Sequence, residues 1–322
     1  MRPALSVILL TTLIGVGQGL FAALYTVQVF DRVGLIQGPS SAVFYPLGCA
    51  IALAFLGVGL GASFFHLGRP ERAWRTVAMW RTSWLSREVI VLPAFMGCVF
   101  LYGLGHYLGW PQHPIVAGAD ATLVIGAVGV LLCAGLFLCT GMIYACLKFL
   151  QEWHTPLTVV NYLLFGSASG LMLATAYAAM VEPPLVGFLA VWTVAFTLAA
   201  LLGRGASLIR NARLKPRSTI QTAIGVKHPR IVQSSQGFLG GSFNTREFFH
   251  ARSDAFVRSI KWTFLIAVFP VPLALLAAGL LGNAPALLVI AFLVQYAGLL
   301  AERWFFFAQA NHPQNLYYQR VS

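Results

Sequence analysis

Charge is scarce in this sequence. Only 9% of its 322 residues are Asp, Glu, Lys or Arg, whereas 58% are hydrophobic and the mean hydropathy is +0.78. Soluble domains carry about 25% charged residues, so this composition excludes a soluble globular protein and indicates an integral membrane protein. The charges are also unequal in sign, with 21 basic and 9 acidic residues and a net charge of +12.

Clusters of metal-binding residues are absent as well. The five cysteines lie inside apolar runs, and none forms a CxxC pair or a Cys/His cluster. This pattern excludes a zinc or iron–sulfur site, so we expect this chain to bind no metal. His66 and His154 are the only two histidines at the same expected depth in the membrane, and haem b is not expected from such isolated histidines. No nucleophile constellation indicates a lipid-modifying enzyme.

Long charge-free runs are abundant instead. A membrane-spanning helix needs about 20 apolar residues. Eight windows satisfy or nearly satisfy this requirement, at 4–30, 43–65, 89–108, 121–147, 157–181, 185–203, 262–281 and 284–301. The sequence therefore predicts an all-α, polytopic bundle of eight transmembrane helices that forms a single membrane domain over residues 1–322.

The basic residues predict the orientation of this bundle. With eight spans, both termini and the loops after spans 2, 4 and 6 share one side of the membrane. All 21 Lys and Arg residues except Arg32 fall on that side. The positive-inside rule then places both termini and these loops in the cytoplasm, in a bacterial inner membrane. The net positive charge thus reflects topology and contact with membrane lipid, and no nucleic-acid partner is expected.

The longest loop has the composition of a docking surface. Residues 204–261 form an extended cytoplasmic loop that is basic and rich in Gly, Ser and Gln, yet it also contains many hydrophobic residues. A disordered loop on anionic lipid is one interpretation. The hydrophobic residues favour a protein partner that covers them. Candidate docking residues in this loop and the loop after span 2 are Arg72, Arg75, His228, Phe238, Phe243, Arg246 and Phe249.

Polar residues in the middle of the spans are few, which argues against a small-anion exporter, a function that needs charged or broken helices at the membrane midplane. Gln18 and Gln295 fall within spans, and we expect both to form interhelical hydrogen bonds. GxxxG spacings at Gly15/Gly19, Gly57/Gly61, Gly105/Gly109 and Gly166/Gly170 permit close helix contacts.

The densest group of reactive side chains runs from the end of span 2 to the start of span 3. This mixture of His, Arg, Ser, Trp and Glu suits a quinone, whose two carbonyls need hydrogen-bond donors and whose ring needs an aromatic bed. Candidate quinone-binding residues are His66, Arg69, Arg81, Ser83, Trp84 and Glu88. Histidine is the residue type suited to proton exchange at physiological pH, which makes His66 a candidate donor to a quinone carbonyl, and a partly desolvated Glu88 can relay a proton.

Structural roles explain the same residues equally well. Glu88 is also compatible with a carboxylate that complements the dipole of helix 3, or with an ion pair to Arg87, Arg81 or Arg72. His66 is compatible with an ordinary interface histidine, and the arginines of this segment with topology determinants.

The same segment carries a family resemblance. The stretches HLGRPERAW at 66–74 and RTSWLSRE at 81–88, with the eight-span layout, resemble the dimethyl sulfoxide reductase membrane-anchor family. The loop stretches STIQTAIG at 218–225 and GGSFNTREFFH at 240–250, with His228-Pro229, resemble a branch found in membrane-bound sulfite-oxidising complexes.

The resemblance implies a three-subunit complex. A molybdopterin catalytic subunit exchanges electrons with a four-cluster iron–sulfur subunit, which docks on the anchor, and the anchor binds ubiquinone or menaquinone. Family members use a histidine and an acidic residue at the quinone site, which correspond to His66 and Glu88. Sulfoxide reductases carry their partners outside the cytoplasm, whereas the basic side here faces inward. We therefore expect a sulfite:quinone oxidoreductase anchor, with the anchor of a sulfoxide, other sulfur-compound or oxyanion reductase as the alternative.

Overall fold

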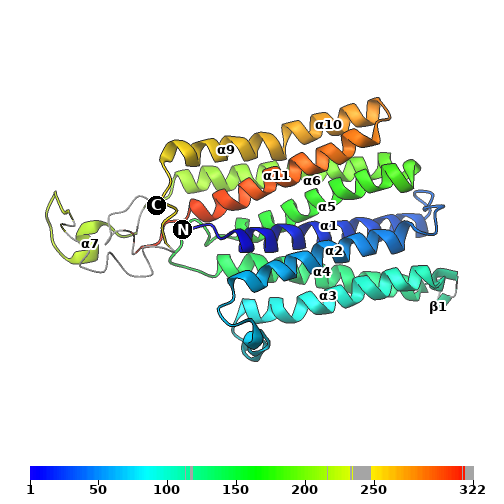
Figure 1. The fold of residues 1–322 in the computed structure, drawn as a ribbon, viewed down its shortest axis with the longest axis horizontal. Coiled ribbons are helices and arrows are strands. Elements are labelled where there is room, and N and C mark those ends of the chain that lie inside the picture. The colour runs from blue at the N-terminus through cyan, green and yellow to red at the C-terminus, as the bar shows by residue number, and fades with distance from the viewer. Residues whose placement is uncertain are drawn as a thin grey trace.

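Among the residues that the structure describes, eight helices long and apolar enough to span a membrane form one bundle (Figure 1), which confirms the predicted all-α class and the number of spans. The computed structural model describes residues 1–112, 114–116, 119–215, 217–232, 234, 248–313 and 315. Its long helices are α1 (Leu5–Arg32), α2 (Phe44–Ser63), α3 (Trp84–Tyr107), α4 (Ala121–Ala145), α5 (Pro156–Val181), α6 (Val186–Ala212), α9 (Asp254–Val268), α10 (Pro270–Leu281) and α11 (Pro285–Ala308).

The seventh span is a broken helix. Helix α9 ends at Val268 and α10 begins at Pro270, with Phe269 between them at φ −111° and ψ −78°. Proline has no backbone N–H and its ring clashes with the preceding helical turn. Two prolines, Pro270 and Pro272, therefore end one helix and start the next within a single span.

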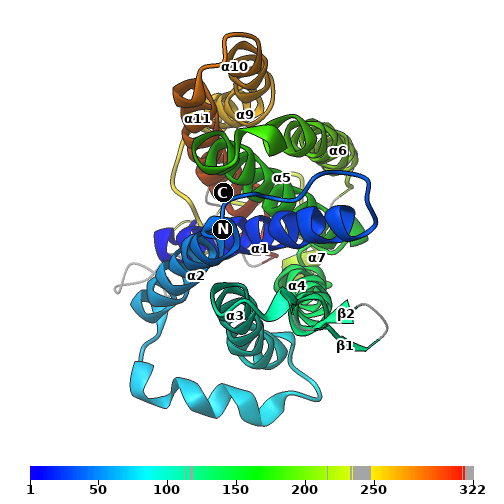
Figure 2. The same cartoon turned by 90° about the vertical axis from the view of Figure 1, so that its right-hand side faces the viewer.

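Helix α1 lies at the centre of the bundle. It packs against α2, α4, α5 and α11, and Figure 2 shows it between the helices of the first and second halves of the chain. Two GxxxG pairs make this contact possible, since a Cβ on Gly19 would lie 2.3 Å from the carbonyl oxygen of Gly166. The predicted close approach is thus confirmed for α1 and α5. At Gly57 and Gly61 a Cβ would meet nothing within 4 Å.

Short elements connect the spans. Two 3₁₀ helices, η1 (Phe64–His66) and η2 (Pro70–Met79), lie between α2 and α3. Between α3 and α4 are η3 (Trp110–Gln112) and an antiparallel pair, β1 (Pro114–Val116) with β2 (Ala119–Asp120). Two further short helices among the described residues are η4 (Pro183–Leu185) and α7 (Ile220–Ile224). The small hairpin is an addition to the purely helical architecture that the sequence predicts.

Both ends of the helical chain meet at one end of the bundle. The Met1 amino group donates a hydrogen bond of 2.9 Å to the carbonyl oxygen of Ala310, just beyond α11. We call this end, which also holds the α2–α3, α4–α5 and α6–α9 connections, the terminal end. Helices α6 and α9 extend into both ends of the 204–261 segment, so the connection between them runs from 213 to 253.

Candidate functional site

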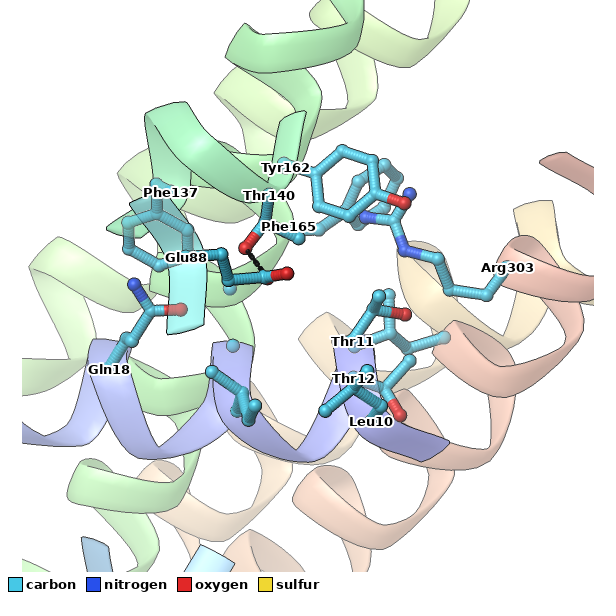
Figure 3. A pocket seen from close by; sticks show the side chains of 14 residues that line it. Leu10, Thr11, Thr12, Gln18, Glu88, Phe137, Thr140, Tyr162, Phe165 and Arg303 are labelled. Atoms are coloured by element: carbon cyan, nitrogen blue, oxygen red, sulfur yellow. Dashed lines mark hydrogen bonds between the residues drawn. The ribbon is translucent and has the colours of Figure 1, made fainter. Parts of the chain in front are cut away.

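Glu88 is the centre of the best-formed polar site. Its side chain faces a small internal cavity near the terminal end, between α1, α3, α4, α5 and α11 (Figure 3). The polar residues that line the cavity are Thr11, Thr12, Gln18, Glu88, Thr140, Tyr162 and Arg303. Phe137 and Phe165 supply aromatic walls. The cavity volume is about 10 Å³, which is about the space that one buried water molecule needs.

Local sequence fixes the position of Glu88. The Ser83 side chain caps α3 by accepting a hydrogen bond of 3.4 Å from the backbone N–H of Ser86, as serine commonly does at a helix start. The helix then begins at Trp84 and carries Glu88 one turn deeper on the same face. There the Glu88 carboxylate is 8% exposed and accepts a hydrogen bond of 2.5 Å from the Thr140 hydroxyl.

The neighbouring arginines point elsewhere. The Arg87 guanidinium lies 4.2 Å from the Trp84 ring centroid and donates to the carbonyl oxygens of Trp80 and Arg81. Arg72 forms its ion pair with Glu71, at 3.9 Å. Among the ion pairs of the described residues, none involves Glu88. A threonine hydroxyl, and not an arginine, is therefore the partner of this buried carboxylate.

A buried ion cluster adjoins the cavity. The Arg204 guanidinium of α6 lies 2.9 Å from one carboxylate oxygen of Glu302, and the Arg303 guanidinium lies 3.6 Å from the other. All three side chains are between 1% and 4% exposed. Arg303 reaches from this cluster to the cavity, where its guanidinium lies 3.7 Å from the Tyr162 ring centroid.

Sequence reasoning missed this cluster. It ended two spans at residues 203 and 301 because charges follow, and it counted Arg204 and Arg303 with the cytoplasmic flanks. The structure instead continues the helices to Ala212 and Ala308 and buries both arginines. A usable signal was present: Glu302 and Arg303 follow their apolar run directly, without the Gly or Pro that would indicate a turn.

The other predicted quinone residues lie at the terminal end, nearer the surface. His66, in η1, is exposed and does not line the cavity. Arg69 and Arg81 are also exposed, whereas Ser83 and Trp84 are half-buried at the start of α3. Of the six, Glu88 is the one that lines the cavity, and Trp84 shares its helix face.

The predicted docking residues are divided between surface and interior. Arg72 and Arg75 are exposed on η2, where Trp74 is 70% exposed and Arg75 lies over its ring. His228 is exposed as well, whereas Phe249 is buried. Phe238, Phe243 and Arg246 lie outside the described residues.

A second polar network lies at the opposite end of the bundle. The Asp120 side chain caps α4 by accepting from the Leu123 N–H, and it pairs with Arg32. A chain of hydrogen bonds then runs inward from Asp120 through Thr122 and Gln28 to the Tyr102 hydroxyl. Burial alone would raise the pKa of Asp120, but the Thr122 and Leu123 hydrogen bonds and the Arg32 charge outweigh it and lower the pKa.

The polar residues predicted within the spans behave as expected. Gln18 donates 3.0 Å to the Cys133 carbonyl oxygen of α4, and Gln295 donates to Thr197 and to the Val268 carbonyl oxygen. These bonds confirm the predicted interhelical role. In the part of the chain that the structure describes, no group of three or more His, Cys, Asp or Glu residues is placed to hold a metal ion.

Comparison with known proteins agrees with the architecture. The model of the DMSO reductase anchor subunit (DmsC) family matches residues 3–309. The chain is also 55% identical to a subunit of the sulfite dehydrogenase of Allochromatium vinosum, over 326 aligned positions that cover all of both chains. With this match across almost its whole length, the chain belongs to the DMSO reductase anchor subunit family.

Proposed function

We propose that this chain is the quinone-binding anchor of a sulfite-oxidising complex in a bacterial inner membrane. In this function it passes electrons from a four-cluster iron–sulfur subunit, itself served by a molybdopterin subunit, to quinone as a diffusible substrate. The observation that carries the proposal is a carboxylic acid, Glu88, buried in a membrane bundle beside hydrogen-bond donors and aromatic rings. Ionisable groups at such depth are costly and are retained mainly for function. The sulfite-oxidising role is supported by the name of the relative.

The donor set suits quinone chemistry, but the internal cavity does not hold a quinone ring. A volume of about 10 Å³ is far below that of the cavities of about 150 Å³ that take up benzene. We therefore place the ring beside the cavity, against Trp84 and the His66–Arg81 segment. Exposed aromatic residues in or directly beside this segment include Phe65 at 88% and Trp80 at 51%. From this position Glu88 connects the ring with the cavity behind it.

The residues around the proposed quinone ring have different roles. Trp84 offers an aromatic surface, while Ser83, Arg81, Arg69 and His66 offer donors to carbonyl oxygens. Glu88 transfers a proton at the ring, and Thr140 holds its carboxylate in position. The basic residues of η2 and the α6–α9 connection face the iron–sulfur partner. Their charge at the terminal end supports a cytoplasmic position for both termini.

The test compares two activities of the intact complex in membranes. Glu88→Gln and His66→Ala should each leave sulfite oxidation with a soluble dye unchanged and slow quinone reduction, since loss of an acid–base group typically costs about 10²–10⁴-fold. Glu71→Gln is the matched control, because Glu71 is a carboxylate of the same segment with a 66% exposed side chain. Full quinone activity in both variants would show that no quinone site depends on this pair.

A further inference from the structure

A second cavity lies between the Glu88 cavity and the terminal end. Its volume is also about 10 Å³, and its polar lining includes Glu152, Asn161, Arg204, Ser207, Glu302 and Arg303. Arg303 lines this cavity and the Glu88 cavity alike. The two cavities therefore share Arg303 as a lining residue, while Glu88 lines one of them and Glu152 lines the other.

Both spaces are suited to water. Each is about the size that a single buried water molecule needs. Within the described part of the chain, Asn161 Oδ1, Asn211 Nδ2 and Arg303 Nε are buried without a hydrogen-bond partner, although more than about 90% of buried polar groups have one. Water in these cavities would satisfy such atoms and connect the polar side chains.

A titratable residue, Glu152, lines the second cavity. Glu152 lies in the α4–α5 connection and is half-buried. Burial raises the pKa of its carboxyl, against the opposing effects of backbone hydrogen bonds, the Met1 amino group and Arg210. On its inner side the charged groups that line the cavity are Glu302, Arg204 and Arg303. A carboxyl with a raised pKa at this position is able to bind and release protons closer to neutral pH.

In the described part of the chain, buried apolar side chains separate Glu88 from the polar network at the opposite end. Along α1, Gln18 of the cavity and Gln28 of the Asp120 network are ten residues apart, or about 15 Å. The side chains between them include Leu20, Phe21 and Leu24, each at most 1% exposed. Phe21 packs against Phe95 and Tyr102 with ring centroids 5.4 Å apart in each case. This apolar layer separates the two polar networks.

We propose that the two cavities form a proton path from Glu152 at the terminal end, past Glu302 and Arg303, to Glu88. The proposal rests on the quinone site proposed above. Reduction of one quinone takes two electrons from the iron–sulfur partner and two protons. Glu88 donates one of these protons to a quinone oxygen and recovers it through the water beside Arg303, and Glu152 recovers its own from the aqueous phase. The exposed His66 delivers the other proton from the aqueous phase to the second quinone oxygen. Arg303 and Glu302 are positioning residues that hold the water in line.

The experiment uses the whole complex in membranes and follows quinone-dependent and dye-dependent sulfite oxidation across pH. Glu152→Gln removes the entrance carboxyl at nearly constant size, and Asn161→Leu replaces a polar wall by an apolar one. We expect quinone turnover to fall about tenfold in each, less than the effect of losing Glu88 itself. The deficit should grow as pH rises, with a larger solvent deuterium isotope effect and unchanged dye activity. Glu182→Gln, a buried carboxyl at the opposite end, is the control.

The outcomes separate the two proposals. If Glu88→Gln abolishes quinone activity while Glu152→Gln retains the wild-type rate, pH profile and isotope effect, the proton path is wrong and the quinone site stands. If Glu88→Gln and His66→Ala also keep full quinone activity, both proposals fall. Should Asn161→Leu not assemble, seen as loss of dye activity, Glu152→Gln alone decides, since its half-buried and nearly isosteric change leaves the bundle core untouched.

Discussion

The guanidinium of Arg303 lies over the face of Tyr162, 3.7 Å from the ring centroid, inside the helix bundle. The rings of Phe165 and Phe306 also lie within 6 Å of it, at 5.8 and 5.5 Å. A desolvated cation over an aromatic face gains about 2 kcal/mol or more. Aromatic residues of α5 and α11, together with the Glu302 carboxylate, thus stabilise a cation that apolar surroundings alone would exclude.

Glu302→Gln should destabilise the bundle strongly. It removes the single carboxylate between Arg204 and Arg303 and leaves two buried cations without a counter-charge. Breaking one partner of a buried ion pair typically costs about 3–5 kcal/mol, and thermal unfolding in detergent would measure the loss. Glu71→Gln, which removes the exposed 3.9 Å pair with Arg72, should cost less than about 1 kcal/mol. Equal melting temperatures for the two variants would contradict a stabilising role for the cluster.

Thr140→Val tests the partner of Glu88. Valine keeps the shape of threonine but cannot donate the 2.5 Å hydrogen bond to the Glu88 carboxylate. A hydrogen bond to a charged group contributes about 1.5–3 kcal/mol, so quinone turnover should fall by roughly one to two orders of magnitude while dye activity persists. Thr175→Val is the control, because Thr175 is also buried but bonds to the Leu171 carbonyl oxygen of α5 and to Thr193 of α6. Equal quinone rates in both variants would remove Thr140 from the site.

The sequence predicts the spans well because a membrane-spanning helix needs about 20 consecutive, predominantly apolar residues, and so long a run is visible in the sequence itself. It predicts Glu88 because the site segment is contiguous and chemically dense. Thr140, by contrast, is an ordinary threonine 52 residues away, and its pairing with Glu88 depends on how α3 and α4 pack. Arg204 and Glu302 illustrate the same limit of sequence-based prediction. A charged residue near the end of an apolar run is interpreted as a loop residue, because its buried partner is known only from the tertiary structure.

The glycine pairs show how equal motifs acquire unequal roles. Gly170→Ala should destabilise the protein by about 1–3 kcal/mol, the usual cost of overpacking, because the new Cβ would lie 2.3 Å from the Gly19 carbonyl carbon of α1. Gly57→Ala, in a GxxxG pair with open space around it, should be neutral or slightly stabilising, as alanine favours a helix. Chemical or thermal unfolding of the two variants would distinguish them, and similar stabilities would contradict a tight α1–α5 contact.

The Asp120–Arg32 pair predicts acid sensitivity at the end of the bundle opposite the termini. The pKa of Asp120 is lowered in the folded protein, so the folded state holds its proton less readily than the unfolded chain does. The stabilisation is therefore fully present above the ordinary carboxyl value of 3.8 and is lost as pH falls through the lower, folded value.

Asp120→Asn should consequently lower the free energy of unfolding at neutral pH and reduce the decline of that free energy in acid. Asparagine still caps α4, so the loss of stability measures the charge interaction between Asp120 and Arg32. We expect this interaction to contribute about 1–2 kcal/mol, because the Arg32 side chain is 36% exposed and solvent partly screens its charge. Arg32→Gln should cost a similar amount, and the double variant little more than either alone. Unfolding measured from neutral pH down to about pH 3 would check this, and a constant gap between wild type and Asp120→Asn over that range would show that the carboxylate charge does not stabilise the fold.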